Sequence, residues 1–159
     1  MADMLVKLYD LNYDEKVFTE LKDSKITVRR AKAPEKFIVL NWIKKEFGDH
    51  WASECDVSFS NKPISCFIAV DEDKNKIIGF SCFDATCKNF FGPMGVDKNY
   101  RGKDIGKALL LIALKSMEES GYAYAIIGGV GPAKFYEKVA NATLIANSEP
   151  GFYKGMLKN

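Results

Sequence analysis

The stretch from Phe90 to Leu111 constrains the fold more than any other part of this sequence. Its first part, Phe90–Val96, is short and apolar, and Gly92-Pro93 interrupts it. This is typical of a strand with a broken ladder, because proline donates no backbone hydrogen bond. A basic turn follows, and then a segment with apolar residues at helical spacing, namely Ala108, Leu109, Ile112, Ala113 and Met117. A strand, a glycine-containing turn and a helix in this order direct free backbone N–H groups at one point, so the sequence predicts an anion-binding turn.

Two common phosphate-binding motifs do not fit this turn. Gly102 stands one residue too close to Gly106-Lys107 for a P-loop, and Ala108 replaces the hydroxyl residue that would contact magnesium. The spaced glycines of a dinucleotide-binding fingerprint are also absent. Positive charge around the turn comes from Arg101, Lys103 and Lys107.

The turn instead resembles the acetyl-CoA-binding motif of the GCN5-related N-acetyltransferase (GNAT) family, Arg/Gln-x-x-Gly-x-Gly/Ala. Arg101 and Gly106 occupy the first and last positions of that motif, and Asp104 stands where the family usually has its first glycine. We expect the Asp104 carboxylate to weaken CoA binding through repulsion of the diphosphate, unless it rotates outward or caps the following helix. The alternative interpretation is a basic surface turn between a strand and a helix.

The resemblance, which is strongest from about Ile64 to Val139, implies an α/β fold of layered α+β type. A single central mixed sheet, mostly antiparallel, would be flanked by helices and would contain a splayed pair of parallel strands. The splayed strands would be Phe90–Val96 and Tyr124–Gly128, and pantetheine would bind the backbone groups freed between them. We expect residues 1–159 to form a single GNAT acetyltransferase domain.

Local patterns predict the remaining elements. Alternating apolar residues indicate a short edge strand within Met4–Leu11. Helical spacing indicates helices that begin near Pro34, Trp51 and Pro132, together with a weak helix after Tyr13. Further strands are expected at residues 26–30, 64–70, 77–83, 143–146 and 151–157.

The resemblance also implies the residues of the site. The backbone N–H of Met94 would polarise the acetyl carbonyl, and the Tyr136 hydroxyl, in a Phe-Tyr-Glu-Lys motif, would serve as the acid for the departing thiolate. Gly129 and Ala140 depart from the family pattern near this tyrosine, and the alternative is that Tyr136 only packs against Phe135. The cofactor-binding residues implied are Met94, Gly95, Val96, Arg101, Gly102, Lys103, Asp104, Ile105, Gly106, Lys107 and Phe135.

The general base is left open, because the central strand carries no carboxylate. The candidates are Glu54, Asp56, Asp84 and His50, each of which is also an ordinary surface group or helix cap, and a chain of water molecules is a further alternative. The segment from Trp51 to Asp56 stands where GNAT proteins commonly wall the acceptor pocket. Its carboxylates would suit a cationic amine.

Composition excludes several other classes. The chain has 23 Lys and Arg against 21 Asp and Glu, a balance that argues against nucleic acid as a partner. No apolar run reaches the length of a membrane span and no signal-peptide core is present, so we expect a cytoplasmic protein without a membrane partner. The cysteines form no CxxC pair and no zinc spacing, so we expect reduced thiols and no metal. Whether the chain forms a homodimer is left open.

The sequence therefore favours an acetyl-CoA-dependent N-acetyltransferase, with acetyl-CoA as co-substrate and a primary amine of a small molecule or protein as acceptor. A second hypothesis is a non-catalytic CoA-binding or sensor module of the same fold. It is retained because Asp104 alters the turn and no base is evident. A nucleic-acid-binding domain has only local lysines in its favour.

Overall fold

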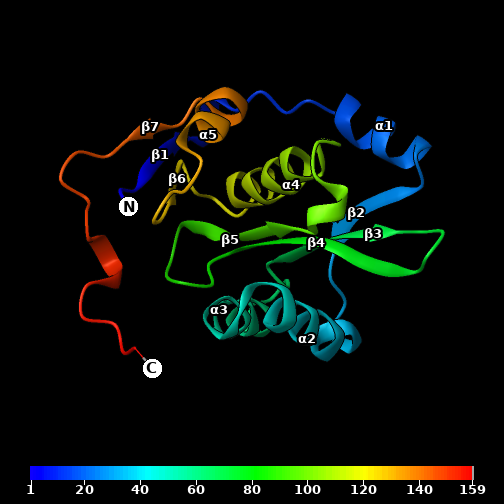
Figure 1. Cartoon of the computed structure of the whole chain (residues 1–159). Helices are drawn as coiled ribbons and strands as arrows, with labels where there is room; N and C mark the ends of the chain where they lie inside the picture. Colours follow the sequence, from blue (N-terminus) through cyan, green and yellow to red (C-terminus); the bar gives the residue numbers. More distant parts are fainter. Residues whose placement is uncertain (159) are drawn as a thin grey trace.

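A seven-stranded mixed sheet separates two layers of helices in the computed structural model, which describes residues 1–158 (Figure 1). The strands are β1 (Met4–Lys7), β2 (Ile26–Arg30), β3 (Cys66–Asp71), β4 (Lys76–Phe83), β5 (Phe90–Val96), β6 (Tyr124–Ile127) and β7 (Thr143–Leu144). The α-helices are α1 (Lys16–Asp23), α2 (Lys36–Phe47), α3 (Asp49–Ser60), α4 (Ile105–Glu119) and α5 (Ala133–Ala140). The strand order is β2-β3-β4-β5-β6-β1-β7.

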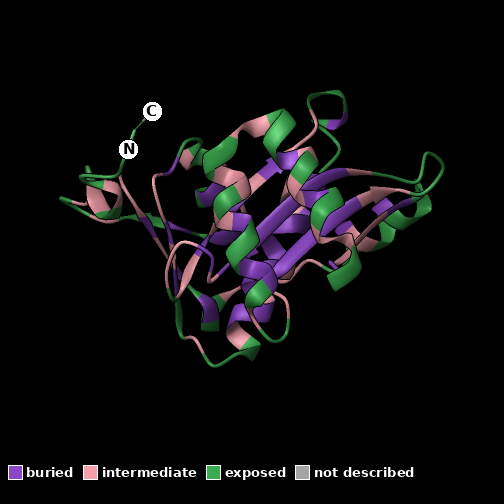
Figure 2. Cartoon of the chain, turned by 90° about the horizontal axis from the view of Figure 1, so that it is seen from below, coloured by how far each residue is buried: buried purple, intermediate pink, exposed green. Residues whose placement is uncertain are grey.

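The helices cover both faces of the sheet. Helices α1, α4 and α5 lie on one face and α2 and α3 on the other (Figure 1). Two buried clusters fill the spaces between the layers, one around Leu109 and Leu114 of α4 and one around Ile43 of α2 and Phe80 of β4. Figure 2 shows burial concentrated on the strands and on the inner faces of the helices. The layered α/β architecture is therefore confirmed.

Strands β5 and β6 form the parallel pair and separate soon after they meet. Their pairing is confined to Phe90 with Ile126 and Phe91 with Ile127, whereas every other strand pair in the described chain is antiparallel. On its other side, β5 shifts register against β4 between the pairs Phe83–Phe91 and Ser81–Met94. Two residues of β5, Gly92 and Pro93, thus face one residue of β4, which is a bulge. The predicted splay at Gly92-Pro93 is confirmed.

Two predictions about the sheet were wrong. Strand β1 is not an edge strand, because it lies between β6 and β7 and pairs antiparallel with both, which buries Met4 and Val6 completely. The segment 151–157 adds no strand to the sheet. Gly151–Tyr153 instead forms a 3₁₀ turn, and Gly151 has a left-handed backbone (φ +69°) that interrupts an extended chain.

The junction between α2 and α3 is fixed by aromatic packing against β5. The Phe47 ring ends α2 and has its centroid 5.1 Å from that of Trp51 and 5.8 Å from that of Phe80. The same ring lies directly on the backbone of Gly95, where an added Cβ would be 2.5 Å from Phe47 Cζ. Gly95 thereby allows the helical layer to approach β5 closely, and this contact brings Trp51 beside the strand.

We predict that Gly95→Ala destabilises the fold by about 1–3 kcal/mol, because the new methyl group collides with a ring that other rings hold in place. Urea denaturation would measure the loss. Gly131→Ala is the matched control, since no atom lies within 4 Å of a Cβ built there. The cost should shrink when Gly95→Ala is combined with Phe47→Leu, and an equal cost in both backgrounds would contradict this account.

Candidate functional site

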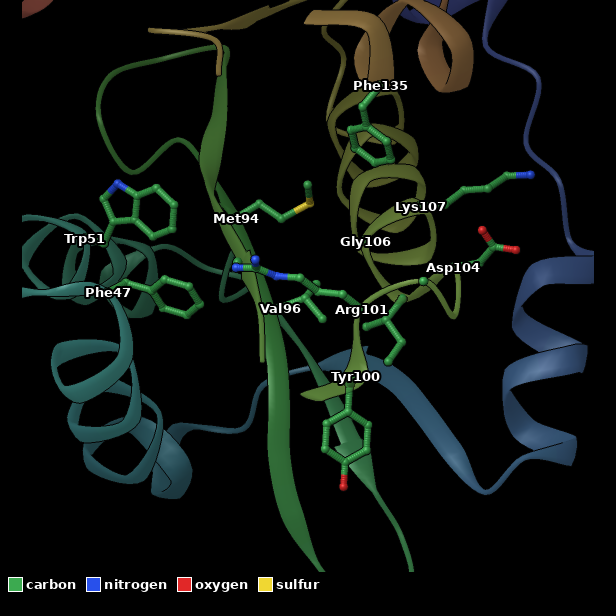
Figure 3. Close-up of a pocket in the computed structure, with 13 residues that line it drawn as sticks. Phe47, Trp51, Met94, Val96, Tyr100, Arg101, Asp104, Gly106, Lys107 and Phe135 are labelled. Carbon is green, nitrogen blue, oxygen red and sulfur yellow. The ribbon is translucent and has the colours of Figure 1, made fainter. Parts of the chain in front are cut away.

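Two cavities meet on either side of the β5 strand residue Met94. The small cavity, about 440 Å³, lies between β5, the turn after it and the first turn of α4 (Figure 3). The large cavity, about 930 Å³, lies beside the bulge of β5 and the loop after β6. Met94 and Trp51 line both. The two cavities are therefore neighbours along the gap between β5 and β6.

The small cavity has the features of an anion site at its α4 end. Gly102 turns the chain with φ +80°, and Ile105, Gly106 and Lys107 form the first turn of α4 at the cavity wall. Ala108 is the first residue there whose N–H has a helical partner, the Asp104 carbonyl at 3.1 Å. Within residues 1–158, no backbone carbonyl accepts from the three N–H groups before it, which are free to bind an anion.

Asp104 stands in the left-handed region, with φ 64° and ψ 17°. This conformation favours glycine, and aspartate and asparagine tolerate it better than other residues do. GNAT proteins usually have glycine at this position. The left-handed backbone is one reason for that glycine, and space for a phosphate is another. The capping role that was one alternative for Asp104 is not seen, because its side chain makes no capping hydrogen bond to α4.

The three basic residues of the turn differ in their contacts and in whether they line the small cavity. Arg101 is exposed and lines the small cavity. Lys107 lines it too, but its Nζ donates to Asp14 Oδ2 at 2.9 Å, and this hydrogen bond raises the pKa of Lys107. Figure 3 shows Lys107 and Asp104 extending away from Phe47 and Trp51. Lys103 is the one predicted cofactor residue outside the small cavity, and its Nζ lies 5.3 Å from the centre of the Tyr100 ring.

Met94, Gly95, Val96 and Phe135 complete the set of predicted residues that line the small cavity. Met94 and Val96 pair with Ser81 and Gly79 of β4 and have no strand partner on the β6 side in the described structure. The site thus places unpaired strand backbone next to the anion-binding turn. A Cβ added to Gly106 would lie 3.8 Å from side-chain atoms of Phe135 and Val96, which is an ordinary van der Waals contact. Packing within the protein therefore does not require glycine at this position.

Tyr136 lines the large cavity. Its ring packs edge-on against Phe91 and Phe135, with centroids 6.4 and 5.1 Å away. Burial raises the pKa of Tyr136 to about 12, and the hydroxyl bonds to no other residue within 1–158. The packing that the alternative hypothesis expected is present, and the hydroxyl is also free to meet a ligand.

Only two of the four candidates for the general base lie at the large cavity. Glu54 and His50 line the large cavity, whereas Asp56 and Asp84 do not. Asp56 forms an ion pair with Lys36 at 2.7 Å. Asp84 accepts hydrogen bonds from the Tyr122 hydroxyl and from the Asn89 N–H, each at 2.8 Å. Asp56 and Asp84 therefore have structural partners outside the cavity.

Sequence reasoning missed the C-terminal wall of the large cavity. Phe152 and Tyr153 line it, together with Thr86 of the β4–β5 loop. Phe152 packs edge-on against Phe90 with centroids 5.9 Å apart, and Tyr153 donates to Glu54 at 2.9 Å. The available signal was the glycine on each side of Phe152-Tyr-Lys154, which favours a turn over a strand.

Three cysteines also converge, although sequence spacing gave no sign of it. The Sγ atoms of Cys55, Cys66 and Cys82 lie within 4.8 Å of one another, and all three residues are fully buried. Among residues 1–158, no further ligand joins the group to complete the tetrahedral set typical of structural zinc. Burial raises the pKa of Cys82, which favours the protonated thiol in this apolar part of the core.

Within residues 1–158, no helix combines the length and apolar character needed to cross a bilayer.

Comparisons with known proteins agree with this geometry. Residues 62–139 match the model of the acetyltransferase (GNAT) domain. Among solved structures, the chain resembles a GCN5-related N-acetyltransferase from Sphaerobacter thermophilus, with a TM-score of 0.66 and 18% identity over 91% of this chain and 48% of that one. It also resembles the GCN5-related glucosamine N-acetyltransferase region of a fungal multi-domain GH3 beta-N-acetylglucosaminidase, with a TM-score of 0.73 and 17% identity.

That second match covers 91% of this chain and 19% of the fungal chain, so this chain spans only part of both proteins. An aminoglycoside acetyltransferase from an uncultured soil metagenomic sample matches with a TM-score of 0.54 and 18% identity, over 74% of this chain and 88% of that one. At these identities the structures establish a shared fold. No curated protein matches the chain.

We predict that Asp104→Gly and Asp104→Asn both tighten CoA binding, by about threefold to tenfold at low salt, because each removes a negative charge beside the anion site. Both residues accept the left-handed backbone. Calorimetric titration at two salt concentrations should show the gain shrinking as salt rises. Asp49→Asn, which removes the same charge outside both cavities, serves as control. Weaker binding by both variants would show that Asp104 helps to build the site.

Proposed function

Because residues 62–139 of this chain belong to the GNAT family, we propose that the protein transfers an acetyl group from acetyl-CoA to a primary amine. The observation that carries this proposal is the meeting of the two cavities at Met94, beside the split between β5 and β6. An anion-binding turn stands at one end of this arrangement and a larger, partly apolar chamber at the other. A two-substrate transfer needs such a pair of connected sites.

The small cavity fits the cofactor through chemistry that the chain itself provides. The free N–H groups at the start of α4, with Arg101 beside them, would hold the diphosphate. The unpaired edge of β5 from Met94 to Val96 would bind the pantetheine amides, and Phe135 would cover the arm. When bound, acetyl-CoA supplies an activated acetyl group as a thioester.

Two groups of the chain would act on the reacting atoms. The Met94 N–H would donate to the acetyl oxygen and stabilise the negative charge that grows there. Tyr136 would donate a hydrogen bond to the leaving sulfur, and its raised pKa keeps it protonated for this role. An alkyl thiol is a stronger acid than this phenol, since the thiol of cysteine has a pKa of about 8.5. The phenol therefore releases its proton fully only if the attacking nitrogen returns one to it.

We predict that acetyl-CoA raises the melting temperature of the protein, since a ligand that binds only the folded state adds stability with its concentration. Differential scanning fluorimetry with millimolar acetyl-CoA tests this directly. Acetate at the same concentration is the control. An unchanged melting temperature up to saturating acetyl-CoA would count against the cofactor assignment.

We predict that Tyr136→Phe lowers kcat about tenfold to ten-thousandfold, the range of a single acid–base group, while leaving the Kd for acetyl-CoA nearly unchanged. Release of free CoA, followed with a thiol reagent, gives the rate. Tyr9→Phe removes the same hydroxyl from an exposed residue outside both cavities and should leave kcat unchanged. Equal turnover by Tyr136→Phe and parent, with chemistry rate-limiting, would remove the acid role. CoA binding without turnover of any amine would instead support a non-catalytic module.

A further inference from the structure

The large cavity is walled mainly by apolar and aromatic side chains from Met1, α3, β5 and the loop before it, the stretch from β6 to α5, and the C-terminal turn. Its volume of about 930 Å³ accommodates a small organic molecule as well as the end of a cofactor arm. Phe90 and Phe152 close one side of it with their rings in edge-on contact. The aromatic residues of the wall are Trp51, Phe90, Phe91, Tyr136, Phe152 and Tyr153. Such a wall favours an acceptor with an apolar body over a polyhydroxylated one, whose hydroxyls would lose their hydrogen bonds to water.

The charges of the cavity limit the acceptor further. Glu54 is the one carboxylate among the described residues that line it, while Lys154 and His50 line it with nitrogen-bearing side chains. A single ammonium group can pair with Glu54. A second or third ammonium group, as on polyamines and aminoglycosides, would meet no carboxylate in the cavity and would lie near Lys154. The balance of charge therefore favours a monoamine.

Glu54 is held in place without being neutralised. Its Oε2 accepts hydrogen bonds from the Tyr153 hydroxyl at 2.9 Å and from the Thr86 hydroxyl. Its Oε1 accepts none from residues 1–158, and no described cation forms an ion pair with it. Burial raises the pKa of Tyr153 to about 12, so this hydroxyl stays a donor. The carboxylate thus has no cationic partner among the described residues and keeps one oxygen free for a ligand.

We propose, building on the acetyl transfer proposed above, that the acceptor is a primary monoamine with an aromatic or other apolar body, and that its ammonium group binds Glu54. The apolar body lies among the aromatic walls, and the nitrogen lies between α3 and the bulge of β5. Glu54 and Tyr136 both line this chamber, so the carboxylate and the phenol open onto the one space that the nitrogen would enter.

The protons balance in this arrangement. Glu54 accepts one proton from the ammonium, and the neutral nitrogen forms the C–N bond as the C–S bond breaks. The sulfur takes the Tyr136 proton, and the nitrogen, which still carries an extra proton after attack, returns it to the Tyr136 oxygen. Glu54 then releases its proton to solvent. The sum is ammonium plus acetyl thioester giving amide, thiol and one free proton.

The test compares three amines as acceptors by the release of CoA thiol. These are 2-phenylethylamine (one amine, apolar body), glucosamine (one amine, polar body) and spermidine (several amines). We expect kcat/KM for 2-phenylethylamine to exceed that for each of the others by about tenfold or more, from the apolar contact and the single charge. A higher kcat/KM for spermidine or glucosamine overturns the proposal.

Glu54→Gln keeps the shape of the side chain and removes its charge. We expect it to lower kcat/KM for 2-phenylethylamine about tenfold to hundredfold, the range of a charged hydrogen bond, and to move the acid limb of the pH profile. Asp56→Asn, which lies on the same helix but outside the cavity, should change neither. Parent-like kcat/KM and pH profile in Glu54→Gln overturn the role of Glu54.

A direct binding measurement tests the proposed amine site independently of the proposed acetyl transfer. Titration of 2-phenylethylamine, followed by the fluorescence of Trp51 in the cavity wall, needs no turnover. If no amine is acetylated yet 2-phenylethylamine binds and Glu54→Gln weakens that binding about tenfold, the acetyl-transfer proposal fails and the cavity assignment stands. If 2-phenylethylamine does not bind even with CoA present, the cavity assignment fails. A melting curve of Glu54→Gln confirms that the variant is folded.

Discussion

The separation of β5 from β6 is the constraint on which the rest of the site depends. A sheet normally satisfies the backbone groups of an interior strand on both sides, and here the bulge at Gly92-Pro93 ends that arrangement after Phe91. The groups left over at Met94 and Val96 face a gap rather than a strand. Every other element of the site is arranged around this gap, with the start of α4 at one end and the α3 wall at the other.

Close packing around the gap explains several residue choices that look unrelated in the sequence. Gly95 accepts the ring of Phe47, and Gly128 accepts the ring of Phe90, whose Cε2 would lie 2.9 Å from a Cβ at that glycine. Each glycine lets an aromatic ring rest directly on the backbone, at Gly95 within β5 and at Gly128 just after β6. The Phe47 ring lines the small cavity and the Phe90 ring lines the large one, where hydroxyl groups from the β4–β5 loop and from the C-terminal turn position Glu54.

Sequence patterns correctly predicted the elements whose structure is determined by residues close to one another in the sequence. The strand Phe90–Val96, the glycine turn and the helix after it follow from proline, glycine and apolar spacing, and the structure places them as predicted. The position of β1 between β6 and β7 depends on contacts between distant segments, as does the wall formed by Phe152 and Tyr153. The left-handed backbone of Asp104 could not be predicted either. The sequence gives the residue type at this position but not the φ and ψ angles that the turn imposes on it.

The placement of β1 has a consequence for how the chain reaches its native state. Met4 pairs with Ile127 on one side and with Leu144 on the other, so β1 pairs only with strands that follow much later in the sequence. Contacts between such distant segments slow folding, because the intervening loop loses entropy before the contact stabilises it. Until β1 inserts, the far edge of β6 and the apolar side chains of Met4 and Val6 stay uncovered. This half of the sheet is thus expected to be the last to close and the first to need protection from other chains.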